Sequence, residues 1–263
     1  MVTACLIYYN FDVASMIRYI GGTHVGAHRD TDYTLRELTG KVPTDVLHDL
    51  GRLYWNGAPN YCNAHSTEAN YQAFRAYGNH SSVNTHPEIA MKAFVKDSKK
   101  HFLLTAKASA FSFCPHSHQT PVAIANAGHP YKKARFVFDS SFRPEPWCYA
   151  INDWTSKDTE PPLHFATAFY EFLVWIWNLR ITYPDEEIYP GDDDVAGAFR
   201  HGKYHPNLVA MHGVVIFGLT ILMTGMTFGD NTSPSNWEPI ARARSHYAQH
   251  IWSQPDLLQR AEP

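Results

Sequence analysis

LVAMHGVVIFGLTILMTGMTF, residues 208–228, is an apolar run long enough to cross a lipid bilayer, for which about 20 residues suffice. The run also contains His212, three glycines and three threonines, and its flanks do not both carry the aromatic or basic anchors of a spanning helix. Its Val, Ile and Thr content and its glycines favour two buried strands joined near Phe217 and Gly218. A single-pass membrane protein is the alternative interpretation of the same run.

The composition of the whole chain is that of a folded protein. Its 263 residues allow one large domain or two small ones, and 44% of them are hydrophobic and 14% aromatic. The formal net charge of −3 gives no overall attraction for nucleic acid. Any nucleic-acid site must therefore be a local basic patch.

The cysteines and the N-terminal sequence predict an intracellular location. The chain has four cysteines that form no Cys-x-x-Cys pair, which favours free thiols in a reducing compartment. The first 16 residues lack the basic segment and long apolar run of a secretory signal. The choice between cytoplasm and nucleus stays open.

Upstream of the apolar run, residues 120–144 read as strand, turn and strand, with a turn at residues 128–130. Residues 163–181 have helical length and are apolar nearly all round, which predicts a buried helix. We expect its aromatic side chains to belong to the core rather than to a base-stacking platform, and they are Tyr170, Phe172, Trp175 and Trp177.

Three consecutive aspartates, Asp192, Asp193 and Asp194, precede the small and apolar residues 195–199. A solvated acidic turn and a metal site both explain such a cluster. The residues after Asp194 distinguish it from its neighbours, because they lead to Phe199 through a strand-like segment of small residues.

Residues 194–199 resemble the first palm motif of reverse transcriptases, which is Asp, three loosely fixed residues, a small residue, then Tyr or Phe. Residues 228–237, FGDNTSPSNW, are similar to the second palm motif of that family. Upstream, KKARFVFDSSF resembles its fingers segment, in which a basic residue precedes an aspartate by four positions, here Arg135 and Asp139. The motifs occur in the family's order, and the resemblance covers roughly residues 120–252.

This resemblance implies an α+β, polymerase-like fold of fingers and palm. A mixed or antiparallel palm sheet, packed on helices, would contain residues 194–199 and a hairpin at 208–227, and the chain would be truncated before the thumb. Residues 1–80 would be an N-terminal extension of unknown role, residues 81–160 a fingers-like region, and residues 161–263 a partial palm.

The implied chemistry is RNA-directed DNA synthesis, as in the reverse transcriptase of a retrotransposon. Two Mg²⁺ ions would assist nucleotidyl transfer, and Mg²⁺ prefers oxygen ligands. By the resemblance, Asp194 would be the catalytic metal ligand, assisted by the backbone carbonyl of Val195. The implied partners are a nucleic-acid template–primer and a deoxynucleotide, with no membrane.

The resemblance also implies how the nucleotide would be held. Arg135, with Lys132 or Lys133, would bind the triphosphate, for which a guanidinium gives a bidentate grip. Phe199 would lie under the sugar and exclude a 2′-hydroxyl. Gly229 would let the backbone approach substrate or template, because glycine has no Cβ.

One feature of the family is missing. No Tyr/Phe-x-Asp-Asp motif follows Trp237, and YPGDDD, residues 189–194, precedes the Ser-Pro segment at 233–234 when the family order requires it to follow. The roles of Asp192 and Asp193 are therefore not assigned. We expect an incomplete two-metal site and a fragment that does not polymerise alone. A non-catalytic nucleic-acid-binding module with a polymerase-like fold is the remaining alternative.

Overall fold

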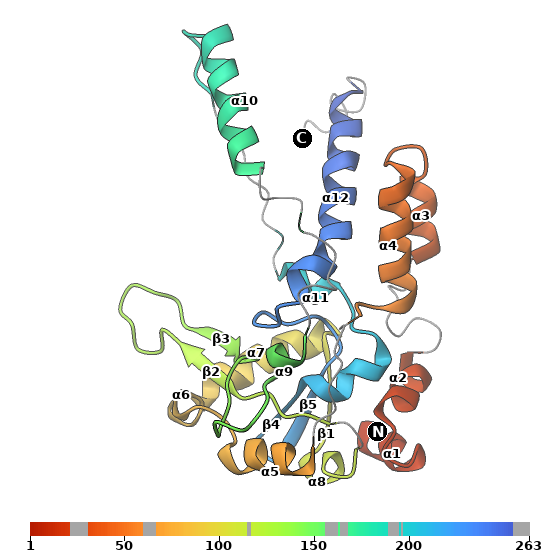
Figure 1. Cartoon of the computed structure of the whole chain (residues 1–263), viewed down its shortest axis with the longest axis vertical. Coiled ribbons are helices and arrows are strands. Elements are labelled where there is room, and N and C mark those ends of the chain that lie inside the picture. Colours follow the sequence, from red (N-terminus) through yellow and green to blue (C-terminus); the bar gives the residue numbers. More distant parts are fainter. Residues whose placement is uncertain are drawn as a thin grey trace.

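The computed structural model describes residues 1–21, 31–59, 67–114, 117–155, 163, 168–188, 195 and 197–254. Within these ranges the chain combines many helices with two small antiparallel sheets, which confirms the α+β class (Figure 1). In the same ranges, no helix combines the length and apolar character that crossing a membrane requires.

The central sheet has three antiparallel strands in the order β1-β5-β4. Its outer strands, β1 (Leu103–Lys107) and β4 (Gly213–Ile216), both pair with β5 (Leu219–Met223). Leu103 pairs with Met223, and Gly213 pairs with Leu222. The pairing of β1 with β5 joins segments more than 100 residues apart, so this sheet ties the two halves of the chain together.

The apolar run at 208–228 therefore folds as a hairpin, as its composition predicts. A 3₁₀ helix (Pro206–His212) leads into β4, and Phe217 and Gly218 connect β4 to β5 with φ values of 52° and 74°. Positive φ at both turn positions matches the right-handed twist of a two-residue hairpin. The predicted turn is confirmed at these residues, and the single continuous helix required by the membrane alternative is not formed.

A second hairpin carries the basic residues singled out in the sequence. Strands β2 (Val122–Ala125) and β3 (Arg135–Phe138) are antiparallel, with Val122 opposite Phe138 and Ala125 opposite Arg135. The connection includes Asn126 and Gly128, both at positive φ. The strand, turn and strand predicted for this region are confirmed.

Helices α12 (Ser233–Trp252) and α4 (Thr44–Asn56) pack side by side. Helix α12 begins at Ser233 with Pro234 in its first turn, where the missing N–H of proline costs no hydrogen bond. Arg242 of α12 reaches Asp45 and Asp49 of α4 (Figure 1).

The other helices before β1 are α1 (Val2–Tyr8), α2 (Val13–Gly21), α3 (Thr31–Leu38), α5 (Glu68–Tyr77), α6 (Ser81–Thr85) and α7 (Pro87–Lys99). Those after β1 are α8 (Ala108–Phe111), α9 (Ile151–Trp154), α10 (Ala168–Thr182) and α11 (Ala198–His201).

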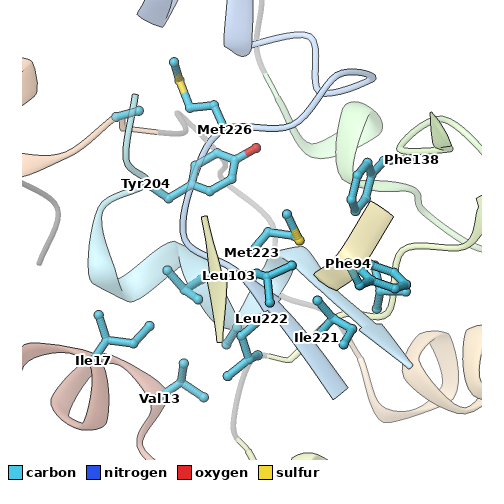
Figure 2. Packing of buried hydrophobic residues seen from close by; sticks show 14 of the residues in the cluster. Val13, Ile17, Phe94, Leu103, Phe138, Tyr204, Ile221, Leu222, Met223 and Met226 are labelled. Carbon is cyan, nitrogen blue, oxygen red and sulfur yellow. The ribbon is translucent and has the colours of Figure 1, made fainter. Parts of the chain in front are cut away.

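The hydrophobic core surrounds the three-stranded sheet. Figure 2 shows Met223 of β5 between Tyr204 and Met226 on one side and the rings of Phe94 and Phe138 on the other. The N-terminal helices add Leu6, Val13, Met16 and Ile17 to the same buried cluster. This core brings α7, β3 and β5 together through Phe94, Phe138 and Met223.

Helix α10 confirms the predicted helix but not its predicted burial. Phe169 and Tyr170 are each 70% exposed and Trp177 is 68% exposed. Figure 1 shows α10 projecting away from the body of the molecule. Apolar residues lie on all sides of α10, and such a pattern is typical of a buried helix. The exposure of α10 depends on the rest of the chain and could not be predicted from the sequence of the helix.

The palm strand predicted for residues 194–199 is also wrong where the structure describes it. Gly197 adopts a left-handed conformation with φ 71°, and helix α11 begins at the next residue. Ala198 and Phe199 are therefore helical and not extended, and alanine and glycine are weak strand formers. The β4–β5 hairpin takes β1 as its third strand instead.

Candidate nucleotide-binding site

The three cations predicted to hold a triphosphate lie at the turn end of the β2–β3 hairpin. Arg135 opens β3, and Lys132 and Lys133 stand in the connection just before it. All three side chains are exposed. The hairpin thus presents three positive charges within four residues, an arrangement that suits a polyphosphate.

The other end of β3 carries the aspartate of the fingers-like segment. Asp139 accepts a hydrogen bond from His80 Nε2 at 3.1 Å, and His80 Nδ1 lies 2.9 Å from the hydroxyl of Tyr77. The backbone N–H of Asp139 donates to the carbonyl of Pro121. These contacts fix the end of β3 against the connection between α5 and α6.

The aspartate predicted as the metal ligand, Asp194, lies outside the described residues, as do Asp192 and Asp193. Val195 is described, and it lines a groove of about 700 Å³ beside α12 together with Ala198 and Trp237. Among the described residues, no three His, Cys, Asp or Glu side chains are grouped so as to hold a metal ion.

Phe199 packs within the second palm-like segment. Its ring centroid lies 4.8 Å from that of Phe228 and 6.5 Å from that of Trp237. Phe199 and Trp237 are each partly buried, and Phe228 is 50% exposed. The first and second palm-like segments, about 30 residues apart, therefore meet through their aromatic residues.

Gly229 brings the second palm-like segment against the fingers-like segment. Its φ is 105°, and a Cβ built on it would lie 2.2 Å from the carbonyl oxygen of Phe138. Contact this close, at a φ that side-chain-bearing residues rarely adopt, requires glycine. The backbone of Gly229 therefore lies directly against the end of β3, and residues 228–231 are called the Gly229 turn below.

Arg200, which sequence reasoning missed, joins the fingers-like segment to α7. Only 8% exposed, it places its guanidinium 4.8 Å from the ring centroid of Phe138 and 3.4 Å from Asp97 Oδ2. Burial lowers the pKa of Arg200, and the nearby Asp97 carboxylate opposes that effect. An arginine directly after the motif's Phe199 was the available signal, because a charged residue in an apolar neighbourhood needs a partner.

A buried polar cluster, also missed, holds Asp230. The hydroxyl of Tyr204 donates to Asp230 Oδ2 at 2.7 Å, and the backbone N–H and hydroxyl of Thr232 donate to Asp230 Oδ1 at 3.0 and 2.9 Å. The ring of His212 stacks on that of Tyr204 at 3.9 Å, with its Nε2 3.8 Å from Asp230 Oδ2.

The pKa shifts in this cluster follow from burial. Burial raises the pKa of Tyr204 well above its ordinary value, and the Asp230 carboxylate adds to that increase. Burial lowers the pKa of His212, against the opposing effect of Asp230. Tyr204 is therefore a protonated donor, and the cluster fixes the residue that follows Gly229.

Gly229 of the second palm-like segment and Arg200, the residue directly after the first, thus both contact Phe138 at the end of β3. No family model, curated protein or solved structure matches the chain. The function is therefore inferred from the geometry of these segments and from the order of their motifs.

Proposed function

We propose that this chain carries the fingers and part of the palm of a reverse-transcriptase-like polymerase, and that it binds a deoxynucleoside triphosphate over β3 and the Gly229 turn. The observation that carries the proposal is the meeting of three separate segments at Phe138. The Gly229 backbone lies against its carbonyl oxygen, and Arg200, next to Phe199, lies over its ring.

Each segment has a distinct part in this proposal. Arg135, Lys132 and Lys133 would neutralise the triphosphate, and the guanidinium would contribute a planar, bidentate contact. Phe199, held by Phe228, would lie against the sugar, where an aromatic ring disfavours a 2′-hydroxyl by its bulk.

Magnesium enters the proposal through Asp194 and the carbonyl of Val195, which offer the oxygen donors that Mg²⁺ prefers. Asp194 lies outside the described residues. A bound ion would neutralise negative charge on the phosphates. Lys132, Lys133 and Arg135 would neutralise part of the same charge without the ion.

The first prediction is that the chain binds a deoxynucleoside triphosphate through Arg135. Titration calorimetry with dATP in Mg²⁺ should give a measurable Kd, and Arg135→Ala should weaken binding by at least about tenfold, equivalent to ~1.4 kcal/mol. Binding should weaken because the variant removes a charge-assisted contact between the guanidinium and the phosphates.

A matched control is Arg52→Ala, which removes an exposed arginine from α4, and it should bind dATP like the unaltered chain. No dATP binding at millimolar concentration would overturn the proposal. Binding of a duplex template–primer without any nucleotide binding would instead favour a nucleic-acid-binding module.

A further inference from the structure

Asn152, at the start of α9, bridges the end of β3 and the Gly229 turn. Its side-chain Nδ2 donates to the carbonyl of Gly229 at 2.7 Å and to the hydroxyl of Ser141 at 2.8 Å. Its Oδ1 accepts from the backbone N–H of Asn231 at 3.0 Å. Its own backbone N–H donates to the carbonyl of Ser140 at 3.0 Å.

This pattern requires a carboxamide. One side chain must donate to a backbone carbonyl and accept from a backbone N–H two residues later, and asparagine does both in one plane. An aspartate of the same shape would place a carboxylate oxygen against the carbonyl of Gly229, so two acceptors would face each other. Alanine would leave both backbone groups without their present partner.

The hydrogen bonds of Asn152 restrict the backbone at the Gly229 turn. The Gly229 backbone lies on Phe138, yet glycine itself restricts the chain least of all residues. Asn152 holds both sides of that turn, at Gly229 and at Asn231, and anchors it to Ser140 and Ser141 just beyond β3.

We infer that Asn152 is a positioning residue that sets the conformation of the Gly229 turn against the end of β3. Its effect on nucleotide affinity rests on the proposed function, because that function places the triphosphate over these two segments. Asn152 acts through Gly229 and is not itself assigned a contact with substrate.

The chain offers a matched control in Asn79. Its side chain also joins two backbone segments, donating to the carbonyl of Val215 at 2.8 Å and accepting from the N–H of Val122 at 3.1 Å. It touches neither Gly229 nor Asn231 through these bonds. Asn79→Ala should therefore lower the Tm about as much as Asn152→Ala without altering the turn.

The test compares hydrogen–deuterium exchange in residues 228–232 of the full chain, with no ligand present. Asn152→Ala and Asn152→Asp should each speed exchange there at least tenfold, whereas Asn79→Ala should leave it unchanged. Equal acceleration in the Asn79 variant, or no acceleration in either Asn152 variant, would overturn the inference.

A dATP titration of the same variants supplies the second readout. At a temperature where all are folded, only the Asn152 variants should bind at least tenfold more weakly, and equal weakening by Asn79→Ala would count against a positioning role. If the unaltered chain binds no dATP, the proposed function fails, and the exchange comparison still decides whether Asn152 sets the turn.

Discussion

Gly229→Ala is expected to lower the free energy of unfolding by about 3 kcal/mol or more. An L-residue at a φ of 105° is strained by roughly 1–3 kcal/mol, and the added Cβ would lie 2.2 Å from the carbonyl oxygen of Phe138. The overlap is with backbone, so no side chain can rotate to relieve it. Urea denaturation followed by circular dichroism measures the loss.

Gly218→Ala separates the two causes of that loss. Gly218 also has positive φ, at 74°, but a Cβ there would meet no atom within 4 Å. Its substitution should cost only the conformational strain, about 1 kcal/mol. Equal losses in the two variants would contradict the close approach of the Gly229 turn to β3.

The second large effect is expected from Arg200→Ala, which should lower the free energy of unfolding by about 3–5 kcal/mol. Arg200 is buried between the ring of Phe138 and the carboxylate of Asp97, with Met223 sulfur 3.9 Å from its Nη1. The variant leaves Asp97 unpaired and removes packing beside β5, so charge and volume are lost together.

Two companion variants identify the source of that effect. Combining Arg200→Ala with Asp97→Asn should cost less than the sum of the single changes, because the lost ion pair is counted once in a double-mutant cycle. Arg242→Ala, which breaks an exposed pair with Asp45, should change stability little. Strict additivity at 97 and 200 would show that the ion pair does not stabilise the fold.

Local signals in the sequence were sufficient where the structure follows local rules. The turn at Phe217 and Gly218 was predicted from glycine and flanking β-branched residues. The β2–β3 hairpin was predicted in the same way. In each case the decisive residues lie within a few positions of one another.

Of the two wrong predictions, one concerns long-range packing and the other local backbone conformation. The burial of α10 depends on what surrounds it, and the sequence of the helix does not contain that information. The strand expected at 194–199 followed from a family resemblance, whereas Gly197 takes a left-handed conformation that begins a helix.

The candidate site was predicted only in part. Arg135, Phe199 and Gly229 came from motif order, and the close approach of Gly229 to Phe138 of β3 could not be read from spacing. Asn152, Arg200 and Asp230 were missed because their partners lie 77, 103 and 26 residues away, at Gly229, Asp97 and Tyr204. The predicted roles of all the site residues stay predictions, namely those of Arg135, Lys132, Lys133, Asp194, Val195, Phe199 and Gly229.

The central claim is that one nucleotide lies over β3 and the Gly229 turn. Photolabelling with a deoxynucleoside triphosphate that carries an arylazide on its γ-phosphate, in Mg²⁺, tests it most directly when the labelled peptides are identified by mass spectrometry. We expect labels within residues 131–139 and 228–230 that excess dATP removes. Labels confined to other parts of the chain, such as α10 or α3, or labels that dATP does not remove, would contradict it.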